Sequence, residues 1–508
     1  MTTLLPPDTP IDIRGRAGSP TEASLARADA AILLVDAAHP ERALARLPHA
    51  RLWVELHRKA RPLPGRAPMQ LVARLPNARH TLAVVSFARS GQSAFDRLEA
   101  CRSVVTTVLQ SGVARLQCHV AVPRPDEAAA WREAVVSAAL AVAAPIPQRK
   151  SKAPPPCDLR RVEVYGAKAG DFAGSAAVAA GNHLARWLAA LPPNELNCVT
   201  YRRTLRELAG REGWSFRFYD ERALARLGAG AFLAVARANA HRGAGIVRLR
   251  YRAAGRGARP RIGLVGKGIC FDTGGINLKT PKGMFLMHGD MQGSAVAVGT
   301  LLACSRSRAR VDIDCWLALT ENEIGPRAYR PQDIVRAANG VTIQVVHSDA
   351  EGRMALADTL VLASRERPRL LLDFATLTGA CVNALTERYS GAFTNRLDLH
   401  QPVQQAGQDS GERVWCFPMD GDFDEEIDSS VADVMQCSLE SKGDHILAAR
   451  FLAHFVEPNV PWVHVDLSSS ERKGGLAHVP TEFTGFGVRF ATRLLGDAAL
   501  LARLAGTA

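Results

Sequence analysis

The chain has 508 residues, 47% of them hydrophobic, and a formal net charge of +13. This length exceeds what one ordinary hydrophobic core contains, so two domains are expected. The sequence has no apolar run of about 18 residues, and its first residues lack the basic start and apolar stretch of a secretory signal, so we expect neither a membrane span nor export.

Arginine supplies most of the positive charge and is spread along the chain. The charge therefore indicates a compositional bias rather than a nucleic-acid surface, although it permits one. Ten cysteines are scattered singly, without a C-x-x-C pair, which argues against a zinc ribbon or a disulfide framework and predicts a cytoplasmic location. Only nine residues are lysine, and three of them fall close together: Lys267, Lys279 and Lys282.

Residues 1–155 are predicted to form a small N-terminal α/β domain with a linker. The first 30 residues are rich in Pro, Gly and Arg and are expected to be loose. The apolar pattern that follows predicts two strands and two helices, at 31–35, 82–87, 95–109 and 126–143. Prolines and basic residues at 145–157 are typical of a linker, which separates this domain from residues 156–508. The first domain contains no catalytic cluster, so we expect a structural, regulatory or assembly role.

In residues 156–508, short apolar runs alternate with helical patterns. Strands are predicted at 262–265, 311–320, 341–346, 370–374 and 462–467, and helices at 174–191, 294–304, 354–363 and 445–455. This alternation predicts an α/β fold with a mostly parallel central sheet flanked by helices. Ligand sites in such sheets lie beyond the carboxyl ends of the strands.

Two carboxylates, Asp349 and Glu351, follow the strand predicted at 341–346. In an extended segment, side chains two residues apart point the same way, so these two are expected to converge. Two like charges so close repel each other unless a cation lies between them, and a divalent metal ion is the usual one. The alternative is a solvated turn in which Arg353 forms a surface ion pair.

A second group of polar residues follows the strand at 262–265. The segment GKGICFDTGG (266–275) contains Lys267 and Asp272, and Asp290 follows nearby. Its glycines allow the tight backbone that lets several side chains converge. Together, four carboxylates have the chemistry of a two-metal hydrolytic centre: Asp272, Asp290, Asp349 and Glu351.

Other catalytic motifs are absent or do not fit. The sequence around Lys267 lacks the G-x-x-x-x-G-K spacing of a phosphate-binding loop. The chain has neither H-E-x-x-H nor G-x-S-x-G, which argues against a helical zinc protease and a serine hydrolase. His288 and His347 are candidates for extra ligands, but structural roles are favoured for both.

Four motifs in order, VGKGICFDTGGINLK, GDMQG, SDAEGR and ATLTGA, resemble the leucyl (cytosol) aminopeptidase family, at about residues 165–495. The resemblance implies hydrolysis of the N-terminal peptide bond of peptides, favouring leucine or other bulky apolar first residues. It also implies a cytoplasmic homohexamer that uses two divalent metal ions, Zn or Mn, with Mg and Co also compatible with such ligands.

The resemblance assigns roles to individual residues. One metal would be held by Lys267, Asp272, Asp290 and Glu351, and the other by Asp272, Asp349 and Glu351. Lys267 must be neutral to serve as a ligand. Lys279 would stabilise the oxyanion, and Arg353 would hold a bicarbonate that relays a proton. Substrate would be bound by Met287, Thr376 and Leu377, although Met287 could equally be a plain core residue.

The chain departs from the family pattern at two places. His347-Ser348 replaces the usual Asn-Thr, which affects the surroundings of the metals rather than the ligands. Residues 467–482 (LSSSERKGGLAHVPTE) differ from the usual small and aromatic residues, in a region that forms part of the specificity pocket. Two rival functions are selective dipeptide hydrolysis at the same centre and architectural DNA binding without catalysis.

Overall fold

The computed structural model describes residues 3–60, 70–152, 155–240, 242–255, 259–440 and 442–504. The chain forms two compact units. The N-terminal unit comprises Pro7–Ala179 and Gly474–Thr481, and the C-terminal unit comprises Met1–Pro6, Ala180–Lys473 and Glu482–Ala508. Residues 153 and 154 of the expected linker lie outside the described residues.

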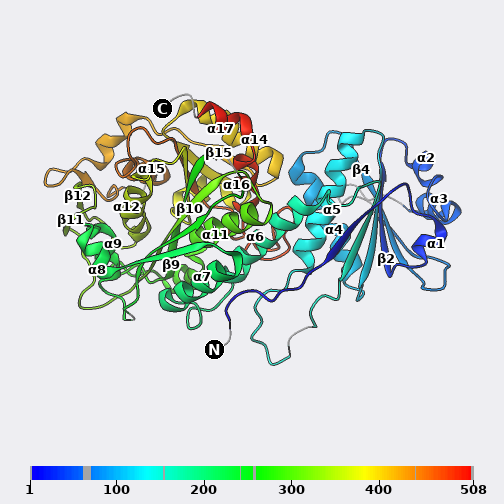
Figure 1. Cartoon of the computed structure of the whole chain (residues 1–508), viewed down its shortest axis with the longest axis horizontal. Coiled ribbons are helices and arrows are strands. Elements are labelled where there is room, and N and C mark those ends of the chain that lie inside the picture. The colour runs from blue at the N-terminus through cyan, green and yellow to red at the C-terminus, as the bar shows by residue number, and fades with distance from the viewer. Residues whose placement is uncertain are drawn as a thin grey trace. The chain divides into compact units, whose positions relative to one another are not determined.

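The N-terminal unit contains a six-stranded sheet in the order β1-β6-β5-β2-β4-β3, parallel except for the β3–β4 pair (Figure 1). Its strands are β1 (Asp12–Arg16), β2 (Ala30–Asp36), β3 (Gln70–Arg74), β4 (Leu82–Ala88), β5 (Arg115–Ala121) and β6 (Arg161–Tyr165). Its helices include α1 (Glu22–Leu25), α2 (Pro40–Leu44), α3 (Ala50–Lys59), α4 (Ala94–Leu109) and α5 (Pro125–Ala143). The two strands and two helices predicted here are confirmed.

The start of the chain is more ordered than its composition indicated. The expectation that the first 30 residues are loose was wrong, because β1 pairs in parallel with β6 and α1 is capped by Thr21. β6 also pairs with β5, and both pairings keep it in the N-terminal unit. The two units therefore divide between residues 179 and 180, within α6 (Ala173–Ala189), which is further along the chain than the boundary expected near residue 155.

The C-terminal unit is built on an eight-stranded sheet in the order β15-β14-β17-β13-β9-β10-β8-β7. The four central strands, β17, β13, β9 and β10, are parallel. The strands are β7 (Ser215–Asp220), β8 (Gly245–Tyr251), β9 (Arg261–Asp272), β10 (Asp312–Asn322), β13 (Leu370–Ala375), β14 (Ser390–Thr394), β15 (Val414–Cys416) and β17 (Trp462–Asp466). The predicted mostly parallel sheet is confirmed.

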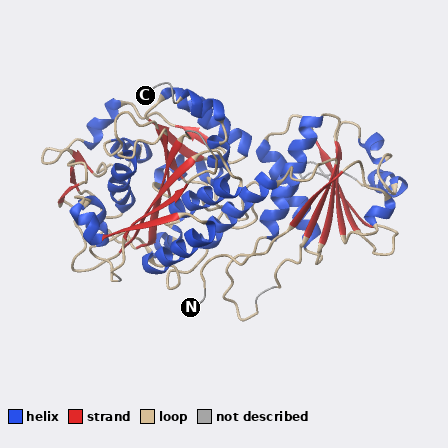
Figure 2. Ribbon diagram, in the orientation of Figure 1, coloured by secondary structure: helices blue, strands red, loops and turns tan. Residues whose placement is uncertain are grey.

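Helices cover both faces of this sheet (Figure 2). α11 (Gln292–Arg306) and α12 (Glu351–Ser364) pack on β9 and β10. The remaining α-helices that begin after residue 190 are α7 (Cys198–Glu212), α8 (Glu221–Arg226), α9 (Gly230–Ala236), α10 (Pro281–Met284), α13 (Gly379–Leu385), α14 (His400–Ser410), α15 (Asp444–Ala453), α16 (Val488–Leu495) and α17 (Ala498–Arg503). None of the described helices has the length and apolar character that crossing a membrane requires.

Close packing brings α11 to the ends of the central strands. A Cβ atom at Gly293 would lie 2.1 Å from the carbonyl oxygen of Phe374, and one at Gly266 would lie 2.4 Å from the Cα of Ser294. Both positions therefore require glycine. This approach places Asp290, two residues before the start of α11, beside the carboxyl ends of β9 and β13.

A separate three-stranded sheet contains β11 (Ile334–Arg336), β12 (Thr342–Gln344) and β16 (Val434–Met435). β12 is the strand that precedes Asp349 and Glu351. The prediction that these carboxylates follow a strand of the central sheet was therefore wrong. They reach the ends of the central strands because α12, which begins at Glu351, packs against β9.

Candidate metal centre

Three buried carboxylates from three different elements converge in the C-terminal unit. Asp272 is the last residue of β9, Asp290 precedes α11, and Glu351 is the first residue of α12. Each offers an oxygen atom, and these atoms lie within 4.8 Å of one another. All three side chains are almost completely buried. Such a cluster is costly without nearby positive charge.

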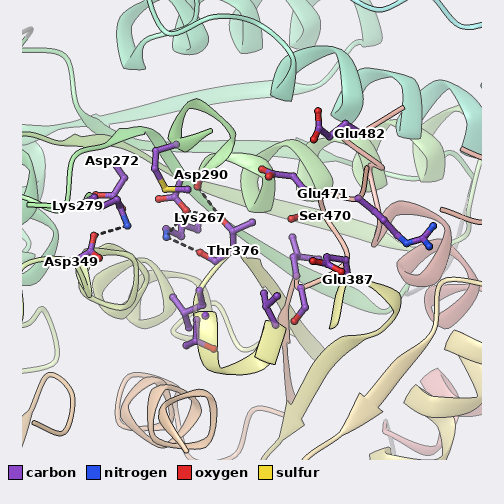
Figure 3. A pocket seen from close by; sticks show the side chains of 18 of the residues that line it. Lys267, Asp272, Lys279, Asp290, Asp349, Thr376, Glu387, Ser470, Glu471 and Glu482 are labelled. Atoms are coloured by element: carbon purple, nitrogen blue, oxygen red, sulfur yellow. Dashed lines mark hydrogen bonds and ion pairs between the residues drawn. The ribbon is translucent and has the colours of Figure 1, made fainter. Parts of the chain in front are cut away.

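Two lysines supply part of that charge (Figure 3). Lys267, also on β9, places its Nζ 2.8 Å from Asp290 Oδ1 and 3.1 Å from Glu351 Oε1. Lys279 Nζ lies 2.9 Å from Asp272 Oδ2 and 2.6 Å from Asp349 Oδ1. Two of the three lysines that fall close together in the sequence, Lys267 and Lys279, thus lie within one site.

A glycine turn delivers Lys279 to the cluster. Gly274 and Gly275 follow β9 with φ values of 86° and 64°, a conformation that favours glycine. The chain then folds back, and the backbone N–H of Lys279 donates to the carbonyl of Thr273 at 3.0 Å. The turn therefore places an amine opposite the carboxylate at the end of the strand.

Burial disfavours the ionised form of the carboxylates in this cluster. Burial, together with neighbouring Asp272, raises the pKa of Glu351 to about 8, and burial raises the pKa of Asp290 to about 6. Burial alone would lower the pKa of Lys267, but the carboxylates of Asp290 and Glu351 outweigh it and raise that pKa. Additional positive charge would stabilise the ionised carboxylates.

Asp349 lies at the edge of this cluster and is less buried than the other carboxylates. It was expected to share an extended segment with Glu351. That geometry was wrong, because residues 348 and 349 form a turn and Ala350 is the N-cap of α12. Asp349 nevertheless faces the cluster, since Lys279 bridges it to Asp272.

Asn322, at the end of β10, was not identified from the sequence. Its Nδ2 donates to Asp272 Oδ1 at 2.9 Å, to Ser348 O at 3.0 Å and to Glu351 Oε2 at 3.4 Å. It thereby positions two of the converging carboxylates. The sequence indicates only that Asn322 ends an apolar strand. Its proximity to Asp272 depends on the register between β9 and β10, which the sequence does not reveal.

His347 and Ser348, the two residues that differ from the family pattern, lie in different surroundings. Ser348 is buried, and its Oγ donates to the carbonyl of Gly274 at 2.7 Å and accepts from the backbone N–H of Asn277 at 2.8 Å. His347 is exposed. Among the described residues, the converging metal-ligand group contains no histidine, and His288 instead packs against the ring of Phe483.

A cavity of about 480 Å³ opens beside the carboxylates. Met287, Thr376 and Leu377 line it, as do Lys267, Lys279 and all four candidate carboxylates. The backbone at 376 and 377 is already engaged: the carbonyl of Thr376 accepts from Lys267 Nζ at 2.8 Å, and the N–H of Leu377 donates to Asp466 Oδ1 at 3.0 Å.

Arg353 is buried but does not belong to the lining of this cavity. Its Nη2 donates to both carboxylate oxygens of Asp444 at 2.9 Å, and its Nη1 donates to the carbonyl of Gln436 at 3.3 Å. Instead of the surface ion pair considered for it, Arg353 forms a partly buried pair with Asp444, 91 positions away in the sequence.

The catalytic-domain model of the cytosol aminopeptidase family matches residues 183–492, a range that includes every candidate site residue. The chain belongs to this family. The resemblance carried by the four sequence motifs is therefore confirmed.

Curated members of the cytosol aminopeptidase family are similar to this chain. One is the probable cytosol aminopeptidase of Methylorubrum extorquens, 39% identical over 345 residues, which cover 67% of this chain and 68% of that protein. Another is that of Afipia carboxidovorans, 37% identical over 328 residues, covering 64% and 65%. The match thus spans about two thirds of the length of these relatives.

Solved structures extend the similarity to nearly the whole chain. The bottromycin maturation enzyme BotP in complex with Mn has a TM-score of 0.80 and 30% identity, covering 93% of this chain and 99% of that one. A mutant of tomato leucine aminopeptidase has a TM-score of 0.81 and 25% identity, covering 97% and 99%. The predicted fold class agrees with both structures.

Proposed function

We propose that this protein is a metal-dependent aminopeptidase that hydrolyses the N-terminal peptide bond of peptides. The observation that carries the proposal is the convergence of Asp272, Asp290 and Glu351 on one point beside a cavity, in a member of the cytosol aminopeptidase family. BotP, whose solved structure contains Mn, supports a divalent metal.

The residues present fit a pair of divalent ions. Asp290 Oδ2 is buried and has no hydrogen-bond partner among the described residues, so it is available as a ligand. We assign Lys267, Asp272, Asp290 and Glu351 to one ion, and Asp272, Asp349 and Glu351 to the other. Lys267 would bind as a neutral amine, with the positive charge of the ion replacing that of its proton beside the carboxylates. When bound, such ions would lower the pKa of a water molecule and polarise the scissile carbonyl. Zn and Mn are the proposed metals, with Mg and Co also compatible.

Lys279 is the proposed electrostatic catalyst. Its ammonium group lines the cavity, and both burial and its carboxylate neighbours act on its pKa, with the carboxylates raising it overall. The lysine therefore remains charged and can donate to the oxygen that becomes negative during attack on the carbonyl.

Thr376 has a positioning role in this proposal. Its Oγ1 donates to Asp290 Oδ1 at 2.8 Å and so holds that carboxylate in place.

The proton relay by bicarbonate on Arg353 stays a prediction. Arg353 Nε is buried without a partner among the described residues, which supports an additional acceptor there. The other end of the guanidinium is paired with Asp444. Bicarbonate binding through this end would require the Asp444 carboxylate to move.

Substrate preference, assembly and location complete the proposal. Met287 and Leu377 line the cavity and support a first residue with a bulky apolar portion. A homohexamer is expected from the resemblance alone. A cytoplasmic location is supported by ten cysteines that form no disulfide, nine of them buried, and by relatives that are called cytosol aminopeptidases.

The proposed function can be tested by metal removal and a substrate panel. We expect the chelated protein to be inactive and to regain activity with Mn or Zn, because the carboxylates alone provide no activated water. Hydrolysis of aminoacyl anilides as well as dipeptides would distinguish an aminopeptidase from a selective dipeptidase. A protein that is inactive on the whole panel with each metal, but retards DNA, would contradict the proposal.

Asn322→Ala provides an independent test of the site. Because Asn322 positions Asp272 and Glu351, we expect its loss to weaken metal affinity by about 10- to 100-fold. The measurement is activity as a function of free metal concentration. Asn339→Ala is the matched control, since Asn339 is exposed and donates to the backbone carbonyl of His454, away from the site. If activity depended on metal concentration equally in the two variants, Asn322 would have no role in metal binding.

A further inference from the structure

The far wall of the cavity is charged. Opposite the carboxylate cluster, the segment that follows β17 contributes Ser468, Ser470 and Glu471 (Figure 3). Four more charged residues line the cavity: Glu387, Arg472, Lys473 and Glu482. Three glutamates therefore face two basic residues, which leaves a net negative charge. A purely apolar side chain would add no positive charge to this wall.

Glu471 is the enclosed carboxylate of this wall. Its side chain is partly buried, whereas Glu387, Lys473 and Glu482 are exposed and more strongly screened by solvent. Glu471 Oε1 accepts from Gln292 Nε2 at 3.0 Å, which holds the carboxyl group in place. Burial, with the charges of Glu482 and Asp290, raises the pKa of Glu471 to about 7. Among the described residues, no lysine or arginine forms an ion pair with it.

The cavity that contains Glu471 also offers apolar surface. Met287 and Leu377 line the same cavity near the carboxylate cluster. A side chain with a methylene stem and a cationic tip matches both parts, because the stem packs on apolar surface while the tip reaches the carboxylate.

We propose that the cavity selects peptides whose first residue is cationic, lysine or arginine, and that Glu471 is the residue that recognises the charge. This inference rests on the proposed aminopeptidase function and names the substrate class of the same site. It modifies the leucine preference implied by the family resemblance, because the departure at residues 467–482 places a carboxylate on the wall of the cavity.

The test compares fluorogenic aminoacyl amides of lysine, arginine, norleucine, leucine and glutamate with the metal-loaded full chain. Norleucine retains the methylene stem of lysine without its charge. We expect kcat/KM for lysine to exceed that for norleucine by about 10- to 100-fold, the typical effect of a hydrogen bond to a charged group. In Glu471→Gln, which keeps the shape of the side chain, we expect this lysine-to-norleucine ratio to fall by a similar factor.

Glu426→Gln is the matched control, because Glu426 is exposed and does not line the cavity. Its ratio should equal that of the parent protein. Circular dichroism would establish that both variants are folded. A ratio near one in the parent, a preference for leucine or glutamate, or an unchanged ratio in Glu471→Gln would overturn the assignment while leaving the aminopeptidase function intact.

Binding provides a second readout. Free L-lysine and L-norleucine can be titrated into the metal-loaded protein by calorimetry. Tighter lysine binding that is lost in Glu471→Gln supports the assignment even if no amide is hydrolysed, in which case the proposed function alone fails. Equal binding of the two amino acids overturns the cationic pocket.

Discussion

Replacement of Glu351 by glutamine or alanine is expected to abolish peptidase activity and to lower the metal content of the protein. Glu351 is buried, converges with Asp272 and Asp290, and is assigned to both ions. Loss of such a ligand should weaken metal affinity by more than the roughly 10- to 100-fold that is typical of outer-shell partners. Elemental analysis after gel filtration, together with kcat/KM, measures both effects.

Folding must be separated from metal binding in this experiment. Glutamine preserves the volume of the side chain, so Glu351→Gln is the more informative variant. Added metal should raise the Tm of the parent protein, because a ligand that binds the folded state stabilises it. The variant should show a much smaller rise, and the exposed Glu426→Gln should behave as the parent. Full activity in folded Glu351→Gln would refute the two-metal proposal.

Replacement of Lys279 by alanine is expected to reduce kcat by about 100- to 1000-fold, the usual effect of removing one oxyanion donor. Metal content should persist, because the remaining carboxylates and Lys267 still converge. The two ion pairs of Lys279 with Asp272 and Asp349 also offer a purely structural explanation for this lysine. Steady-state kinetics distinguishes oxyanion stabilisation by Lys279 from a purely structural role.

Lys282→Ala is the matched control, since Lys282 is exposed and lies three residues further along the same segment. It should retain the kcat of the parent. If Lys279→Ala changed KM alone, Lys279 would be a binding residue. If it lost its metal, the lysine would serve to hold Asp272 and Asp349 in place rather than to stabilise the oxyanion.

The tertiary structure changed the interpretation of several residues. Asp349 and Glu351 were predicted to lie in an extended segment after a strand of the central sheet. The preceding strand belongs to another sheet, and α12 begins at Glu351 itself. Arg353 forms an ion pair with Asp444 that the sequence did not indicate, and its bicarbonate role stays a prediction. The strand that pairs with β12 in parallel and the carboxylate that binds Arg353 both lie about 90 residues away, too far for local periodicity to indicate them.

The sequence by itself determined the alternation of strands and helices, the family, and the residue types available for a metal centre. These properties are local: apolar periodicity reports secondary structure, and short glycine-rich motifs carry the carboxylates and lysines. Only the tertiary structure decided how they are surrounded. The register of β10 against β9 places Asn322 beside Asp272, and the segment after β17 places Glu471 on the cavity wall. Both depend on the packing of segments far apart in the chain, which fixes the neighbours of a side chain but leaves no local pattern in the sequence.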